Sequence, residues 1–205
     1  AGFADVPGTR IIVFYPKDGV SRVQELQMVT QKGDNTSVVA IHGNFDDAQT
    51  GVKKIFADKE FGAELADHGF QFSSANSINI GRLVPQVVYY VYAYASLLAN
   101  EEIKDGEEIN VTVPTGNFGN ILAAYFAKQL GVPIKKLICA SNDNKVLYDF
   151  FQTGTYDRQR DFILTTSPSM DILISSNLER LLYLSTGCDA EQTAKLMNQL
   201  GTEGH

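Results

Sequence analysis

The sequence alternates short apolar runs with amphipathic segments, and this alternation constrains the fold more than any other feature. Buried strands are indicated by TRIIVFYP, residues 9–16, and by SVVAIHG, residues 37–43, because both are rich in β-branched and aromatic residues. Each run is followed by a segment with helical spacing of its apolar residues, over about 20–33 and 45–61. Two strand–helix units in succession predict parallel strands joined by right-handed crossovers.

The same alternation returns in the second half of the chain. The predicted order there is strand, helix, strand and helix, over residues 108–114, 121–131, 135–141 and 144–154. Beyond Thr155 the pattern is irregular and then helical again. The sequence therefore predicts the α/β class, with open, mainly parallel sheets flanked by helices.

A polar stretch rich in small residues, from about 62 to 82, interrupts the alternation. It is the best candidate for a domain boundary, and a long helix over about 78–99 is expected to follow it. We predict one α/β lobe in residues 1–75 and a second in residues 76–205.

Composition narrows the classes of partner. The chain has 205 residues, is 44% hydrophobic and carries a net charge of -7, which argues against nucleic acids and anionic membranes as partners. The most apolar run, residues 83–99, is interrupted by Pro85 and Gln86, so it predicts a buried helix and not a membrane span. Cys139 and Cys188 lack the spacing of a metal or redox site, and we expect a cytoplasmic protein without a metal.

The segment GNFGN, residues 116–120, lies where a predicted strand meets a predicted helix. Gly116 and Gly119 permit positive φ and a close approach of a ligand to the main chain. Successive N–H groups in such a turn, together with the N-terminus of a helix beginning near Gly119, form a cradle for an anion such as phosphate. The amides of Asn117 and Asn120 add donors without adding charge. A plain tight turn is the alternative, and the residues alone leave both interpretations open.

Other phosphate motifs fit this segment badly. A Walker loop requires Lys and then Ser or Thr after its last glycine, and no Lys follows here. The dinucleotide fingerprint requires GxGxxG, whereas the spacing in this chain is GxxG. A phosphate at this junction would therefore be held without lysine.

A second candidate site lies in ANSINIGR, residues 75–82, which gathers Asn76, Ser77, Asn79 and Arg82 before the predicted long helix. These groups suit the phosphate or carboxylate of a substrate. The alternative is an ordinary capping cluster with Ser77 as the N-cap. SPSMD, residues 167–171, is either another polar wall of the pocket or a helix start with Pro168 as its first helical residue. His42 follows a strand, where it could be a ligand or an acid–base group, but the preferred interpretation gives it no such role. The neighbouring Asp46 and Asp47 are expected to serve the N-terminus of the following helix.

Several blocks of the sequence, in the same order, resemble threonine synthases, which are pyridoxal-phosphate enzymes of the tryptophan-synthase-β fold type. The blocks are PTGNFGNILAAYFAKQLGVPI, FYPKDGVSRVQELQMVT, HGNFDDAQTGVKKIF, ANSINIGRLVPQVVYY and SPSMDILISSNLERLLY. The resemblance extends from about Gly8 to Gly187. It implies an enzyme that converts O-phosphohomoserine and water to threonine and phosphate, with pyridoxal 5′-phosphate as the cofactor. In that family the GNFGN loop holds the cofactor phosphate. The resemblance implies that Gly116, Asn117, Phe118, Gly119 and Asn120 do so here.

The resemblance also identifies what this sequence does not contain. The family's Schiff-base lysine lies in a segment of the type FHGPTxxFKD, upstream of a second motif SGDTG, and neither occurs in these residues. The lysine is expected upstream of Ala1, so residues 1–75 would be part of the smaller lobe and 76–205 part of the larger, cofactor-phosphate-binding lobe. Lys17 lies near the end of a strand, but a solvated loop lysine is the preferred interpretation. We therefore expect the chain alone to be inactive, a central fragment of an enzyme.

Two alternatives remain at this stage. One is a related lyase of the same fold, such as a threonine dehydratase or a cysteine synthase. The other is a non-catalytic module that binds a phosphorylated metabolite through the same loop. The sequence does not decide between a monomer and a dimer.

Overall fold

The computed structural model describes residues 2–167 and 170–205, and the chain divides into two compact units. One unit ends at Phe72 and the other comprises Ser73–His205. The division falls inside the polar stretch that predicts a boundary. The assignment of residues 1–75 and 76–205 to the two lobes of an enzyme stays a prediction.

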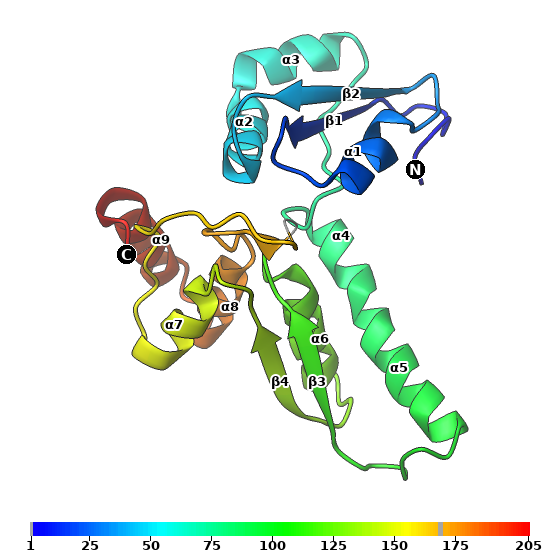
Figure 1. Ribbon diagram of the computed structural model, residues 1–205, viewed down its shortest axis with the longest axis vertical. Helices are drawn as coiled ribbons and strands as arrows, with labels where there is room; N and C mark the ends of the chain where they lie inside the picture. Colours follow the sequence, from blue (N-terminus) through cyan, green and yellow to red (C-terminus); the bar gives the residue numbers. More distant parts are fainter. Residues whose placement is uncertain (1, 168–169) are drawn as a thin grey trace. The chain divides into compact units, whose positions relative to one another are not determined.

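The first unit contains two parallel strands and their crossover helix. The strands β1 (Ile11–Pro16) and β2 (Thr36–Ile41) pair with Ile11 opposite Thr36 and Pro16 opposite Ile41 (Figure 1). This pairing confirms the parallel arrangement predicted from the alternation of strands and helices. The helices of the unit are α1 (Arg22–Val29), α2 (Phe45–Ala57) and α3 (Lys59–Asp67).

Side-chain caps fix the ends of these helices. Ser21 forms a capping box with Gln24 at the start of α1, and Asn44 forms one with Asp47 at the start of α2. Asp58 ends α2 and caps α3, where its side chain accepts a hydrogen bond from the third residue of α3. The prediction of one helix over 45–61 is therefore wrong. A cap inside it divides the segment in two, and the second helix continues to Asp67, into the polar stretch that begins at about residue 62.

The second unit opens with a helical segment in three parts. The helix α4 (Ile80–Leu83), a 3₁₀ turn (Val84–Gln86) and the helix α5 (Val87–Ala99) follow each other without a break. Pro85 lies in the 3₁₀ turn, where a missing N–H is tolerated. The predicted long helix is thus present, with a change of helix type at its proline.

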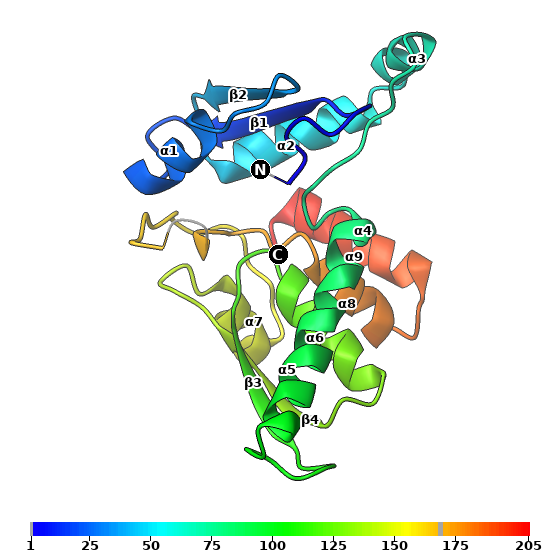
Figure 2. The same cartoon turned by 90° about the vertical axis from the view of Figure 1, so that its right-hand side faces the viewer.

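The centre of the second unit is a parallel pair of strands covered by a helix. The strands β3 (Ile109–Pro114) and β4 (Ile134–Ala140) pair with Pro114 opposite Ala140. The crossover between them is α6 (Gly119–Gln129), which packs on both strands and on α5 (Figures 1 and 2). Three more helices follow, α7 (Val146–Thr153), α8 (Leu178–Ser185) and α9 (Ala190–Glu203).

The core of this unit forms around α6. Its buried apolar side chains include Leu83, Val113, Phe118, Ile121, Leu122, Ala124, Ala127, Ile134, Leu147 and Leu178. The small residues Ala123, Ala124 and Ala127 are completely buried, so the helix lies close to its neighbours. This packing fixes the N-terminus of α6 beside the carboxyl ends of β3 and β4, where ligands of parallel α/β sheets bind. None of the helices in the described part of the chain is both long and apolar enough to cross a membrane.

Candidate functional site

The loop between β3 and α6 leaves its backbone N–H groups free. Phe118 caps α6 in the left-handed conformation, with φ 65° and ψ 1°, and no side chain caps the helix. Among residues 2–167 and 170–205, no acceptor takes the N–H groups of residues 116–120. Free N–H groups that succeed one another through a left-handed turn into a helix form a concavity that binds anions.

Gly119 has a different role from the one expected. Positive φ was predicted for a glycine of this loop, but Gly119 is the first residue of α6 and the left-handed residue is Phe118. Gly119 instead provides space. A β-carbon at this position would lie 3.0 Å from the Ser77 Cβ and 3.4 Å from the Asn177 Nδ2. The glycine therefore lets the loop approach two other segments of the chain.

The carbonyl groups of the loop are held by the segment that precedes α8. The Ser175 hydroxyl donates to the Gly116 carbonyl at 2.6 Å. The Asn177 backbone N–H and side-chain amide both donate to the Asn117 carbonyl, at 3.0 and 2.9 Å. Ser175 and Asn177 are both buried. Because the carbonyls are fixed by donors from one segment, the loop is held in a conformation in which its own donors remain available.

The side chain of Asn120 is engaged with the helical segment that contains α5. Its Oδ1 accepts a hydrogen bond from the Tyr90 hydroxyl at 2.6 Å, and its Nδ2 donates to Gln86 Oε1 at 3.0 Å. Burial raises the pKa of Tyr90 to about 12, so this hydroxyl remains a donor even at moderately alkaline pH. What Asn120 can offer a ligand is its backbone N–H.

The ANSINIGR segment reaches the loop through Ser77. The Ser77 hydroxyl accepts a hydrogen bond from the Asn177 side chain at 3.0 Å and is oriented toward Asn76 Oδ1, at 3.3 Å. Two segments separated by 100 residues are thereby joined beside Gly119. Ser77 thus lies next to the loop, and Asn76 is connected to it through the Ser77 hydroxyl.

The remaining two residues of that segment differ from each other. Asn79 caps α4 by accepting from the Gly81 N–H at 2.9 Å, so within the alternative interpretation of a capping cluster the choice of Ser77 as the N-cap is wrong. Arg82 is exposed, and within the described ranges its guanidinium has no hydrogen-bond or ion-pair partner. Arg82 is therefore the available cation of this segment, whereas the amide of Asn79 serves the helix end.

Comparison with known proteins identifies the family. No family model matches the chain. Threonine synthase-like 1 of Homo sapiens is 48% identical over 197 residues, which are 95% of this chain and 26% of that protein. Threonine synthase of Saccharomyces cerevisiae is 42% identical over 185 residues, 87% of this chain and 34% of the yeast protein. Among solved structures, PLP-bound threonine synthase from Brucella melitensis superposes with a TM-score of 0.81 at 44% identity, covering 98% of this chain.

The chain belongs to the threonine synthase family. A second solved threonine synthase, from yeast, superposes with a TM-score of 0.79 at 39% identity over 99% of this chain. The chain spans 41% of the Brucella protein's chain and 40% of the yeast protein's, so it corresponds to less than half of each solved relative. The fold predicted from the resemblance is confirmed over the region that this chain covers.

Three residues that support this loop of the threonine synthase fold were not predicted as site residues. They are Ser175, Asn177 and Arg180, which lie immediately before or within the first turn of α8. The available signal was the cluster SSN, three polar residues between an apolar run and an apolar helix. Such clusters commonly cap helices, so their reach to a loop about sixty positions earlier requires the tertiary structure.

A second polar cluster surrounds Asp171. This carboxylate is buried and accepts hydrogen bonds from the side chains of Asn142 and Asn144, at 2.6 and 3.0 Å, and from the backbone N–H of Thr165, at 2.8 Å. Asn142 and Asn144 follow the carboxyl end of β4, beside the loop that follows β3. Asp171 thus ties the SPSMD segment to the same edge of the sheet. Pro168, the first helical residue in one interpretation of SPSMD, lies outside the described residues, and the described Met170 is in a 3₁₀ conformation.

The remaining candidate groups are His42, in the first unit, and Cys139, whose thiol forms a hydrogen bond with Thr115 directly before the loop. His42 is exposed after β2, in the first unit. Cys139 is partly buried in β4, and burial raises the pKa of its thiol, which makes it a poor nucleophile at neutral pH. Among the residues that the structure describes, no group of three or more His, Cys, Asp or Glu side chains could hold a metal ion.

Proposed function

We propose that this chain supplies the phosphate-binding part of a pyridoxal-phosphate site, in an enzyme that converts O-phosphohomoserine and water to threonine and phosphate. The observation that carries the proposal is the row of free N–H groups over residues 116–120, at the N-terminus of α6. It occurs in a chain that is similar to a PLP-bound threonine synthase over nearly its whole length.

The residues of the loop fit a phosphate monoester. Backbone N–H donors in a helix N-terminus bind phosphate oxygens without requiring a side-chain cation, and this loop contains none. The donors of residues 116–120 would hold the cofactor phosphate, with the ring of Phe118 buried beneath them. Pyridoxal phosphate, when bound, supplies the electron sink for chemistry at the substrate's carbon atoms. The chain's own contribution is to fix the position of the phosphate end.

The substrate phosphate is proposed to bind at the ANSINIGR segment. Arg82 is exposed and has no partner in the described ranges, so its guanidinium can form charge-assisted hydrogen bonds with a phosphate or carboxylate. Ser77 and Asn76 border the loop from the same segment. Asn79 would act by capping α4 and so fixing the position of Arg82.

The attachment of the cofactor's aldehyde requires an amine, and the loop of residues 116–120 does not contain one. A reactive lysine is held in a desolvated environment that lowers its pKa. Lys17 follows β1 in an exposed turn of the first unit. We therefore propose that the 205 residues bind the phosphate end of the cofactor but do not catalyse the reaction without further sequence of the family.

The proposal is tested by titrating the ¹⁵N-labelled chain with inorganic phosphate and with pyridoxal phosphate. The backbone amide resonances of residues 116–120 are expected to shift in both titrations. Borohydride reduction after incubation with the cofactor should not label one lysine stoichiometrically. Stoichiometric labelling of Lys17 would contradict the proposed inactivity of the chain, and unshifted loop amides would contradict the cofactor site.

A second experiment separates the enzyme from the non-catalytic alternative. The 205 residues are expressed as part of a polypeptide that also contains the family's FHGPTxxFKD and SGDTG segments, and phosphate release from O-phosphohomoserine is measured. An active enzyme supports the proposed reaction. Phosphate binding without any turnover would favour a module that only binds a phosphorylated metabolite.

A further inference from the structure

A half-buried guanidinium lies behind the loop. Arg180, in the first turn of α8, donates from Nη1 to the Ser77 carbonyl at 2.9 Å and from Nη2 to the Ile78 carbonyl at 2.7 Å. Nη1 also donates to the side-chain oxygen of Asn177. In the described part of the chain no carboxylate pairs with Arg180, and the adjacent Glu179 is exposed.

The acceptors of this guanidinium are the same residues that fix the loop. Asn177 has no exposed surface, and its amide nitrogen donates to both the Asn117 carbonyl and the Ser77 hydroxyl. Ser77 in turn lies against Gly119, where a β-carbon would be 3.0 Å from the Ser77 Cβ. Arg180 therefore joins its own segment to residues 77–78, and it is connected to the loop through Asn177 and Ser77.

The charge of Arg180 is as important as its hydrogen bonds. The chain has a net charge of -7, and the loop itself contains no Lys or Arg. A cation that is half-buried and bound only to neutral oxygens retains its field, because neither a counter-ion nor bulk water fully screens it. The planar fork of arginine can reach several carbonyls at once, which a lysine ammonium cannot do in the same geometry.

We propose that Arg180 is the positioning residue of the anion cradle formed by residues 116–120. It holds Ser77 and Asn177 against the loop, and its charge strengthens the binding of a doubly charged phosphate. This inference rests on the proposed function, since it assigns a cation to that same site. It predicts that affinity for phosphate depends both on the charge at position 180 and on the fork geometry.

The test compares Arg180→Gln, Arg180→Lys and the control Arg158→Gln. Arg158 also donates to a backbone carbonyl, that of Gly201 at 2.8 Å, and its replacement changes the net charge equally. Inorganic phosphate is titrated into each 205-residue variant at two salt concentrations, and the Kd is read from the loop amides. Arg180→Gln should weaken phosphate binding about tenfold and reduce its salt dependence. Arg180→Lys should weaken binding about threefold and keep the salt dependence, and Arg158→Gln should weaken it less than about twofold.

A measurement without ligand tests the positioning role separately. Hydrogen exchange of the Asn177 amide, which donates to the Asn117 carbonyl, should be faster in both Arg180 variants than in Arg158→Gln. If the unmodified chain does not bind phosphate, the proposed function and the charge role both fail, and exchange still decides the positioning role. If phosphate binds and Arg180→Gln binds it as tightly as the unmodified chain, the inference about Arg180 is overturned while the proposed function stands. Unchanged exchange of Asn177 in both variants overturns the positioning role in either case.

Discussion

The β1–α1 and β3–α6 junctions have the same topology but begin their helices differently. After β1, Ser21 forms a capping box, in which its hydroxyl accepts from the Gln24 N–H at 3.3 Å and the Gln24 side chain accepts from Ser21 N–H at 3.1 Å. After β3, Phe118 takes the N-cap position and no side chain caps α6. The first junction satisfies its own donors, whereas the second leaves them free. The β3–α6 junction, where no side chain caps the helix, is therefore the one of these two that can offer its N–H groups to the proposed ligand.

The two crossover helices also differ in burial. No residue of α1 is buried, and its apolar residues Val23, Leu26 and Val29 are exposed. Six residues of α6 are buried, from Gly119 to Ala127. The helix that presents free donors is therefore the one whose position is fixed by a core. An anion site requires this rigidity, because preorganised donors bind without a cost of ordering.

The largest expected effect tests this difference in burial. Leu122→Ala removes a side chain with no exposed surface, and we expect it to lower the free energy of unfolding by about 2–5 kcal/mol. Leu26→Ala on α1, where the side chain is 39% exposed, should cost less than about 1 kcal/mol. Urea denaturation followed by circular dichroism measures both. Equal costs would show that α1 is as well packed as α6.

The second prediction concerns the space at Gly119. Gly119→Ala places a β-carbon 3.0 Å from the Ser77 Cβ, so Ser77 must move, and we expect a loss of about 1–3 kcal/mol together with weaker phosphate binding. Gly201→Ala in α9 is the matched control, because a β-carbon there has no atom within 4 Å. The control should gain up to about 1 kcal/mol from helix propensity. Thermal unfolding and phosphate titration of both variants measure the two effects. If Gly119→Ala changes neither stability nor phosphate affinity, the close approach of Ser77 to Gly119 does not constrain the loop.

The third prediction is that phosphate stabilises the β3–α6 junction but not the β1–α1 junction. Ser21→Ala should destabilise the first unit by about 1 kcal/mol, because the cap of α1 is lost. Phosphate at about ten times its Kd should stabilise the second unit by about 1.4 kcal/mol and leave the first unchanged. Hydrogen exchange resolves the amides of α1 from those of α6. Phosphate protection of α1 amides in Ser21→Ala would indicate that any uncapped helix of this chain binds the anion.

A fourth prediction uses the hydroxyl that holds Asn120. The pKa of Tyr90 is raised by burial to about 12, above its ordinary value of 10.0, so its contribution to stability is complete below pH 10 and is lost as the pH rises toward 12. Tyr90→Phe should abolish this alkaline loss in the second unit. Unfolding free energies measured between pH 9 and 12 provide the check. A variant with the same alkaline slope as the unmodified chain would assign the titration to another group.

Much of this arrangement could be predicted from local sequence, and each of the failures has a physical reason. The β-branched runs, the parallel pairing and the start of α6 at Gly119 follow from patterns within a few residues. The split at Asp58 was missed because an aspartate inside an amphipathic segment is also compatible with an uninterrupted helix. The choice of Phe118 as the left-handed residue was missed because local preference favours a glycine, whereas burial of the Phe118 ring stabilises this conformation.

The support of the loop was beyond sequence reasoning for a different reason. Asn177 and Arg180 act through atoms of Ser77 and Asn117, which are distant along the chain. No periodicity encodes such contacts. The loop motif itself could be identified, but the residues that hold its carbonyls required the fold.

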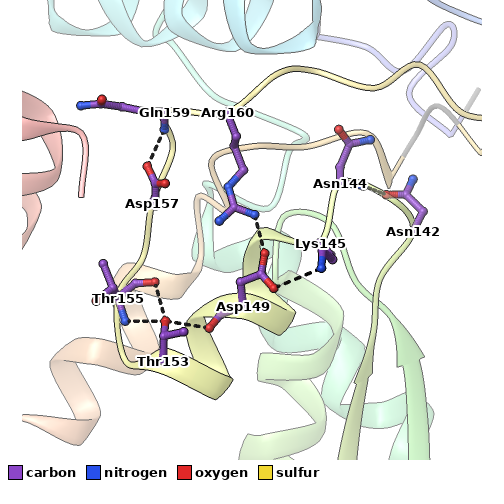
Figure 3. A network of polar contacts seen from close by, with 9 residues as sticks. All are labelled: Asn142, Asn144, Lys145, Asp149, Thr153, Thr155, Asp157, Gln159 and Arg160. Atoms are coloured by element: carbon purple, nitrogen blue, oxygen red, sulfur yellow. Dashed lines mark hydrogen bonds and ion pairs between the residues drawn. The ribbon is translucent and has the colours of Figure 1, made fainter.

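The smallest expected effect lies at a third helix start, that of α7 after β4. Unlike α6, α7 carries an acidic residue in its first turn, Asp149, whose carboxylate lies between Arg160 and Lys145 (Figure 3). The Arg160 guanidinium donates to Asp149 at 2.7 Å and the Lys145 ammonium lies 3.6 Å away. The hydrogen bond from Arg160, with a further contribution from Lys145, lowers the pKa of Asp149 below its ordinary value of 3.8.

Because the pKa is lowered in the folded chain, the contribution to stability is present above pH 3.8 and is lost as the pH falls through the folded value. Arg160→Gln should raise the pKa of Asp149 toward 3.8, and Lys145→Gln should raise it less, since the Lys145 contact is longer. Carboxyl ¹³C titration by NMR measures both shifts. The order of the two shifts is the critical result: a larger effect of Lys145→Gln would mean that long-range charge, and not the Arg160 hydrogen bond, replaces the missing cap at this helix.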